Sequence, residues 1–150
     1  MQMDFNGRLS VKIPPGSAAD FLSGAGNIAS CIPDTSDFKQ TGDRSFSVKV
    51  RVGIGFFKGI FDMNGTVTES TPSRKAFSIE GHGVGSRVKI EVSMDISGGA
   101  DASDISWNAV FEISGLVGGV EEGVIRKIGQ DRIDEILANA KARMEGHMRK

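Results

Sequence analysis

The chain has 150 residues, which fits one domain whose core removes roughly 70% of the surface that the unfolded chain exposes. It carries 18 lysine and arginine residues against 19 aspartate and glutamate residues, and this net charge of −1 gives no electrostatic footprint for DNA or RNA. The single cysteine, Cys31, excludes an internal disulfide, and the chain shows neither the layout of a secretory leader nor a run of about 18 apolar residues. We therefore expect a cytoplasmic domain that contacts a membrane, if at all, peripherally at its cytoplasmic face.

The N-terminal part of the chain predicts one strand followed by two short helices. Apolar and polar residues alternate over residues 3–13, so one face of this strand is buried and the other is wet. Two prolines end the strand, and Ser17 is expected to cap the first short helix. A second short helix, over about residues 27–31, ends before Pro33 because proline restricts the residue that precedes it.

Six further strands are predicted to follow as a meander in which one face is apolar throughout. They are expected over residues 35–41, 45–52, 57–67, 77–82, 87–96 and 103–114. The first is expected to be an edge strand, and the glycines at 81, 83 and 85 are expected to form the turn after the fourth. Asn64-Gly65 leaves two interpretations open, a hairpin turn that splits the third strand or a glycine bulge within one long bent strand.

From Leu116 to Met144 the pattern changes to helical period. One apolar stripe comprises Val117, Val120, Val124, Ile128, Ile133, Ile136, Leu137, Ala140 and Met144. The four glycines before residue 130 indicate that the first half is either kinked or kept small for close approach to the sheet. Residues 145–150 are expected to be a frayed tail of a single domain over 1–150. The basic residues after position 140 suit either an anionic membrane surface or an ordinary solvated helix end.

Several short motifs carry a resemblance to a known family. They are Phe5-x-Gly7, Cys31-Ile32-Pro33, Val52-Gly53-Ile54-Gly55-x-x-Lys58-Gly59-x-Phe61, Glu80-Gly81-x-Gly83, Trp107-x-Ala109 and Gly115. In this order and spacing they resemble the carbon monoxide dehydrogenase G-subunit family, part of the larger superfamily of START and birch-pollen-allergen-like (Bet v 1-like) domains. Members of that family usually have glycine after the Cys-Ile-Pro tripeptide, whereas this chain has Asp34.

The order of the predicted elements is the one that the helix-grip fold requires, and the resemblance implies the same fold. We therefore expect an α+β, START/Bet v 1-like domain with the element order β-α-α-β6-α. A curved antiparallel sheet of six to seven strands would wrap around the long C-terminal helix.

The resemblance also implies a function. It predicts a non-catalytic protein that binds a hydrophobic, lipid-like or quinone-like molecule and is associated with a carbon monoxide dehydrogenase-type molybdenum enzyme. Two alternatives stay open. One is an assembly or interaction protein for that dehydrogenase with no ligand of its own, and the other is a cyclase or hydrolase that acts on a hydrophobic substrate.

The titratable residues do not favour catalysis. The two histidines are His82, on an outward strand face, and His147, in the expected tail, so neither is placed to activate a nucleophile. The carboxylates of the strands lie on outward or uncertain faces, which leaves no inward pair for acid and base catalysis. A structural zinc site needs about four Cys or His ligands, and the chain has three such residues. We expect no enzyme activity, metal or cofactor, and we interpret Cys31 as a small apolar filler.

The inward aromatic residues leave a choice between a packed core and the lining of a cavity. Gly59, Gly65, Gly81 and Ala109, opposite a glycine-rich half-helix, favour an apolar cavity of roughly a few hundred Å³. The chain has no tyrosine, so the lining would suit an isoprenoid or acyl ligand. The residues expected to line the cavity are Phe46, Val48, Val50, Phe57, Phe61, Met63, Phe77, Ile79, Val92, Met94, Trp107, Ala109, Phe111, Val120, Val124 and Ile128.

Overall fold

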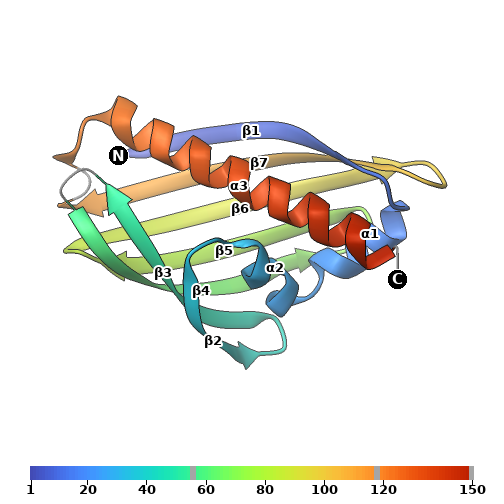
Figure 1. Cartoon of the computed structure of the whole chain (residues 1–150), viewed down its shortest axis with the longest axis horizontal. Coiled ribbons are helices and arrows are strands. Elements are labelled where there is room, and N and C mark those ends of the chain that lie inside the picture. Colours follow the sequence, from blue (N-terminus) through green and yellow to red (C-terminus); the bar gives the residue numbers. More distant parts are fainter. Residues whose placement is uncertain (55–56, 117–118, 149–150) are drawn as a thin grey trace.

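The computed structural model describes residues 1–54, 57–116 and 119–148, and within them the chain forms one sheet and three helices (Figure 1). In chain order the elements are β1 (Gln2–Val11), α1 (Pro15–Leu22), α2 (Ala25–Cys31), β2 (Thr35–Gly42), β3 (Ser45–Ile54), β4 (Phe57–Ser70), β5 (Arg74–Gly83), β6 (Ser86–Gly98), β7 (Ser103–Gly115) and α3 (Glu122–Met148). The seven strands are antiparallel and ordered β1-β7-β6-β5-β4-β3-β2. The prediction of an α+β helix-grip fold is confirmed.

The long helix α3 runs across one face of the sheet, called the inner face here, while α1 and α2 close the end of that face near the C-terminal end of α3 (Figure 1). The hydrophobic core lies between these helices and the inner face, because alternate residues of β1 and of β3 to β7 point there, whereas the edge strand β2 is exposed throughout. None of the helices in the described residues is both long and apolar enough to cross a membrane.

The first helix begins earlier than expected. Proline at position 15 occupies the first helical turn, where its missing N–H costs no hydrogen bond, and Pro14 is the N-cap. The prediction that Ser17 caps this helix was therefore wrong. The strand before it ends at Val11, but Ile13 stays buried, and Ser103 Oγ donates a hydrogen bond to its carbonyl oxygen at 2.6 Å.

Asn64-Gly65 forms neither a hairpin nor a bulge. β4 is continuous from Phe57 to Ser70, and Gly65 pairs in regular register with Phe46 on β3 and Ile79 on β5. The ring of Phe46 lies over this glycine, where a Cβ atom would be 2.5 Å from two ring carbons. The interpretation of one long strand is confirmed, whereas the hairpin turn and the bulge at Gly65 were wrong, because the register is irregular only between Val67 and Glu69 and the glycine serves a close side-chain approach.

The turn between β5 and β6 is shorter than expected. Gly81 and Gly83 belong to β5, and the turn itself is Val84-Gly85, with φ angles of 51° and 67°. Positive φ at both central residues is the geometry of tight hairpin turns that match the twist of a sheet. The predicted three-glycine turn is thus a two-residue turn.

Helix α3 begins at Glu122, six residues after the expected start at Leu116. The first inward side chain of the helix is Ile125, which is 4% exposed, whereas Val124 is 42% exposed. Gly129 approaches Phe5 closely, since a Cβ atom there would lie 3.1 Å from the ring. Close approach therefore explains this glycine. At its other end α3 continues to Met148, so residues 145–148, expected as part of a frayed tail, are helical.

Lys75 is a buried charge on the inner face that was not predicted from the sequence. It is 3% exposed, and its Nζ donates to Ser70 Oγ at 2.6 Å and to Ser23 Oγ at 2.8 Å, beside the end of α1. Burial lowers the pKa of Lys75, and the nearby charge of Asp20 partly opposes this effect. The alternation of the strand indicates this inward position, because Lys75 lies two residues before Phe77 and therefore on the same face of β5.

Candidate functional site

Two adjoining cavities lie between the inner face of the sheet and α3. The first has a volume of about 190 Å³ and lies beneath the N-terminal half of α3, and the second, of about 160 Å³, lies toward its C-terminal end. Both are bordered by Ile32, Ile79, Ile90, Phe111, Ile133 and Ile136. Because they share these walls, the two cavities are neighbouring parts of one apolar interior.

Most of the residues expected from the sequence border this interior. Those at the first cavity are Phe46, Val50, Phe61, Met63 and Ile128, and those at the second are Phe77, Val92, Met94, Trp107 and Ala109. Ile79 and Phe111 border both cavities. The strand residues are thus brought together as the period-2 pattern requires.

Four expected residues are placed differently. Val48 is 3% exposed but packs in a separate core cluster with α2, and Val120 packs against the main core in the loop before α3. Val124 points to solvent because Ile125, one position later, faces the sheet. The side chain of Phe57 lies outside the described residues.

Lining residues from β1, α1, α2 with its C-cap, and α3 were not predicted from the sequence. They include Met3, Phe5, Leu22, Ile28, Cys31, Ile32, Ile125 and Gly129. The sequence does indicate that Ile125 and Gly129 face inward. Both positions lie at helical spacing before Ile133 and Ile136, on the same face of the helix. The short helix α2 gave no comparable signal, since only its packing against β3 places Ile28 and Ile32 at the cavities.

The inward glycines do not create this space. Met63 Sδ fills the position above Gly81, the Phe46 ring covers Gly65, and Val84 Cγ2 lies 2.8 Å from where a Gly59 Cβ would stand. The expectation that these glycines leave room was wrong, because larger neighbours occupy each position. The cavities instead lie between α3 and the inner face of the sheet, and side chains of both line them.

The walls of both cavities are almost wholly apolar. In the described lining, Arg132 is the charged side chain at the first cavity, and Cys31 and Trp107 carry the polar side-chain atoms at the second. Trp107 Nε1 is buried and has no hydrogen-bond partner, the one such side-chain nitrogen or oxygen in the described part of the chain. An indole N–H is a donor only, so this site can be satisfied only by an acceptor.

Cys31 lies at the end of α2, where its Sγ donates to Asn27 O at 3.3 Å. Burial raises the pKa of the Cys31 thiol, and this outweighs the lowering by the Ser30 hydrogen bond and by Arg143. A thiol with a raised pKa is a weak nucleophile at neutral pH. Its position supports the interpretation of Cys31 as a small apolar filler.

Arg132 joins α3 to the loop between α2 and β2 beside the first cavity. Its Nη1 donates to Asp34 Oδ2 at 3.1 Å and to Pro33 O at 3.3 Å. Further along α3, Asn139 Nδ2 donates to Cys31 O at 2.9 Å. These contacts satisfy carbonyl groups that the end of α2 leaves free and fix α2 against α3 at the edge of the interior.

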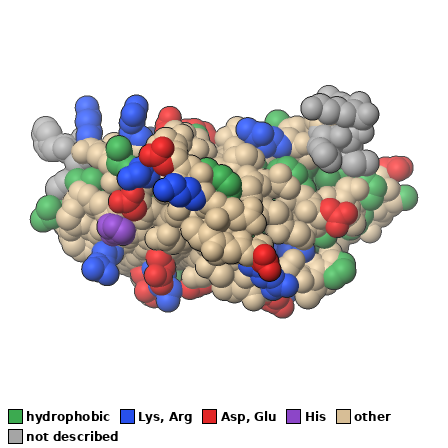
Figure 2. Space-filling model, turned by 90° about the horizontal axis from the view of Figure 1, so that it is seen from below, with side chains coloured by type: hydrophobic (Ala, Val, Ile, Leu, Met, Phe, Trp, Pro, Cys, Tyr) green, Lys and Arg blue, Asp and Glu red, His purple; other side chains and the backbone are tan. Residues whose placement is uncertain are grey.

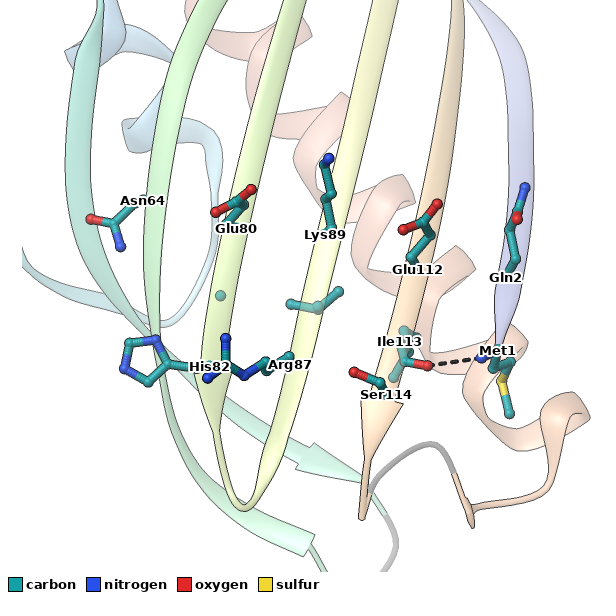
Figure 3. A pocket seen from close by; sticks show the side chains of 12 residues that line it. Met1, Gln2, Asn64, Glu80, His82, Arg87, Lys89, Glu112, Ile113 and Ser114 are labelled. Carbon is teal, nitrogen blue, oxygen red and sulfur yellow. Dashed lines mark hydrogen bonds between the residues drawn. The ribbon is translucent and has the colours of Figure 1, made fainter.

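A wider hollow of about 570 Å³ lies on the outer face of the sheet (Figure 3). A row of polar side chains, Asn64, Glu80, Lys89, Glu112 and Gln2, crosses it from β4 to β1 in direct cross-strand register. Alternating charges at this spacing stabilise a solvated sheet face. His82 lies 3.7 Å from Asp62 nearby, and both side chains are largely exposed.

The chemistry of the interior favours binding. No aspartate, glutamate or histidine borders either cavity in the described lining, and the described residues hold no group of three or more potential metal ligands. An apolar space with a single free donor can hold a hydrophobic molecule by shape and burial.

Comparison with known proteins places this geometry in context. The family model that matches the chain is CoxG, the G-subunit of carbon monoxide dehydrogenase, and it covers residues 7–145. No curated protein sequence matches the chain.

Solved structures share the fold at low sequence identity. A conserved protein from Geobacillus kaustophilus is 17% identical with a TM-score of 0.85, and 95% of each chain is covered. A START superfamily protein from Mycobacterium smegmatis is 12% identical with a TM-score of 0.71 over 95% of this chain and 97% of that one. The Zhui aromatase/cyclase from Streptomyces sp. R1128 is 11% identical with a TM-score of 0.63, over 95% and 96%. At these identities the likeness shows the fold alone.

Proposed function

The chain belongs to the CoxG family, the carbon monoxide dehydrogenase G-subunit family that its motifs predicted, and from this we propose that it binds a hydrophobic, lipid-like or quinone-like molecule without transforming it. The proposed site is the apolar interior between the sheet and α3. The proposed lining comprises the residues that border the two cavities.

The observation that carries this proposal is the pair of adjoining cavities. Their volumes of about 190 and 160 Å³, taken as one space, fall at the lower end of ligand sites, which span roughly 300–1,000 Å³. Their lining on α3 extends from Ile125 to Met144, about 28 Å at 1.5 Å per residue. A long, narrow, apolar space suits an isoprenoid or acyl chain better than a compact polar metabolite.

The free N–H of Trp107 supports a ligand that carries an acceptor oxygen. A buried donor without a partner costs about 1–3 kcal/mol, and a carbonyl oxygen would remove that cost. A quinone offers such carbonyl groups next to a hydrophobic tail, whereas a pure hydrocarbon offers none. This favours a quinone-like molecule within the hydrophobic class.

The family also supports a partner. We propose that the protein acts in association with a carbon monoxide dehydrogenase-type molybdenum enzyme, in the cytoplasm or at its membrane face. Aromatase/cyclase chemistry is the property of one structural neighbour. In this chain, the described lining offers no carboxylate or imidazole for acid and base steps, which supports a non-catalytic role.

Fluorescence gives a direct test, because Trp107 is the single tryptophan and the chain has no tyrosine. Titration with a short-chain quinone analogue should quench Trp107 emission saturably, and a competing acyl ligand should restore it. Native mass spectrometry of the same sample should show one bound quinone. A linear, non-saturable response together with a ligand-free mass spectrum would refute the proposal.

A further inference from the structure

Two short segments from opposite ends of the chain meet on the inner face of the sheet, on the neighbouring strands β1 and β7 (Figure 1). The antiparallel register places Gly7 of β1 opposite Trp107 of β7. Two residues away, Phe5 of β1 stands opposite Ala109 of β7. In each pair an aromatic side chain faces a residue with a methyl group or with no side chain. These small residues decide where the two rings can lie.

The indole of Trp107 extends over Gly7. A Cβ atom built on Gly7 would lie 2.8 Å from Cζ2, 3.1 Å from Cε2 and 3.2 Å from Nε1 of Trp107. These are consecutive atoms of the ring, so Gly7 lies against the edge of the indole that carries the N–H group. Carbon atoms in contact are about 3.5–4.0 Å apart, so a side chain at position 7 would push this edge away. The lack of a side chain there determines the position of Nε1.

The ring of Phe5 is fixed by other neighbours. Its centroid lies 5.2 Å from that of Phe111 in an edge-to-face arrangement, and Arg126 Cζ lies 5.5 Å from the same centroid. On the side of α3, a Cβ atom on Gly129 would be 3.1 Å from Phe5 Cζ. Because Phe5 has no room to yield, an indole edge displaced from Gly7 moves away from β1 and into the apolar interior.

Gly7 lies where the two cavities meet along β1. Phe5 borders the first cavity and Leu9 borders the second, and Gly7 stands between them on the same face of the strand. Trp107 borders the second cavity and is 9% exposed, and its Nε1 has no hydrogen-bond partner within the described chain. The free donor therefore stands beside the path of a ligand that spans both cavities.

From this arrangement we propose that Gly7 determines the ligand specificity of the interior. It acts through Trp107, because it holds the N–H edge of the indole at the junction of the cavities. There the N–H group selects a ligand with a carbonyl oxygen over a hydrocarbon of the same shape. Gly7 is thus a positioning residue, and this role rests on the proposed function, since a hydrophobic ligand has to occupy the interior.

The selection has a simple physical basis. A carbonyl oxygen satisfies the buried N–H of Trp107, whereas a hydrocarbon leaves it buried and unpaired. A site with a buried donor therefore discriminates against the analogue that lacks the acceptor. A displaced indole loses this discrimination, because a hydrogen bond weakens steeply when its angle becomes unfavourable.

Two probes of the same shape test the selection. Duroquinone carries two carbonyl oxygens, and hexamethylbenzene carries methyl groups in their place. Equilibrium dialysis of the full chain gives the dissociation constant of each probe. The wild-type chain should bind duroquinone at least about tenfold more tightly than hexamethylbenzene.

Gly7→Ala should lower this preference to about threefold or less, mainly through weaker binding of duroquinone. Trp107→Phe should abolish the preference, because it removes the N–H group. Gly7→Ala added to Trp107→Phe should change the preference no further, since Gly7 acts through the indole. The emission maximum of Trp107 should shift in Gly7→Ala, which reports the displaced ring.

Gly65→Ala is the matched control. Its added Cβ also meets an aromatic ring, that of Phe46 at 2.5 Å, but this ring carries no polar atom. Gly65→Ala should therefore destabilise the fold while the preference for duroquinone and the emission maximum of Trp107 stay at their wild-type values. Circular dichroism checks that each variant is folded.

Only saturable uptake reports on the interior. Figure 2 shows one outer face of the molecule, where hydrophobic side chains are scattered among charged ones of both signs. Scattered apolar side chains do not form a binding site, so a probe that adheres to such a surface gives a linear uptake. The linear part is subtracted before the dissociation constants are compared.

The proposal is overturned if folded Gly7→Ala keeps the wild-type preference, or if Gly65→Ala lowers it as much. If Gly7→Ala does not fold, Trp107→Phe alone has to abolish the preference and, added to Gly7→Ala, has to restore folding. Failure of either result also overturns it.

Failure of the proposed function gives a different result. A wild-type chain that takes up neither probe saturably refutes the hydrophobic site itself. Saturable and equal binding of both probes leaves that site in place and refutes only the selection by Gly7 and Trp107.

Discussion

Arg132 on α3 binds Asp34 in the loop after α2, with 3.1 Å between Nη1 and Oδ2, although the two residues are 98 positions apart. Asp34 has a φ of 59°, in the left-handed region that favours glycine. This explains why the related motif usually has glycine here. In this chain the aspartate keeps the glycine-like backbone and adds a side-chain contact to α3.

Substitutions at Asp34 should separate the backbone from the contact. The side chain of Asp34 is 63% exposed, so its ion pair with Arg132 contributes less than about 1 kcal/mol. The left-handed backbone costs a non-glycine residue about 1 kcal/mol. We therefore expect the free energy of unfolding of Asp34→Gly to lie within about 0.5 kcal/mol of the wild-type value. That of Asp34→Ala should be about 1–2 kcal/mol lower than that of Asp34→Gly. Urea unfolding measures both, and equal stability of the two variants would contradict this account.

Gly65→Ala should destabilise the sheet. The added Cβ would lie 2.5 Å from the Phe46 ring, which is 3% exposed and has little room to move. Overpacking of this kind costs about 1–3 kcal/mol. Gly99→Ala is the control, because no atom lies within 4 Å of the added Cβ. If thermal unfolding shows the same small change for both variants, the close approach has no energetic consequence.

Ala109→Leu should fill the second cavity. Ala109 borders that cavity and is 4% exposed, so a larger side chain can extend only into the apolar interior. We expect the quinone analogue to bind at least about tenfold more weakly, a loss of about 1.4 kcal/mol. Ala138→Leu, on the exposed side of α3, should leave binding unchanged. Ala109→Val gives a milder second variant, and undiminished binding by both folded cavity variants would show that the ligand does not occupy this cavity.

Lys75 should make stability depend on pH. Burial lowers its folded-state pKa below the ordinary 10.5, so at neutral pH the folded chain bears the cost of a buried ammonium group. As the pH rises through the lowered folded value toward 10.5, the folded state releases the proton first, and the free energy of unfolding rises. Relative to Lys75→Met, the wild-type chain should therefore gain stability over this window. Parallel pH profiles of the two proteins in urea unfolding would count against a desolvated Lys75.

Local patterns along the chain were sufficient to predict the class of fold and most of the strand residues that border the interior. Alternation with period 2 placed Phe77, Ile79 and Phe111 on one face, because successive side chains of a strand point to opposite sides whatever surrounds them. The change to helical period indicated a single long helix after the sheet. These are local properties of the backbone and need no distant partner.

Tertiary structure alone decided the features that depend on contacts between distant segments. Phe46 covering Gly65 keeps β4 continuous, and the packing of α3 on β1 turns Ile125 inward and Val124 outward. The space beneath α3, the burial of Lys75 and the free N–H of Trp107 follow from how the helices pack on the sheet. A local pattern cannot specify them, because each depends on the distance and angle between surfaces that the chain brings together only when it folds.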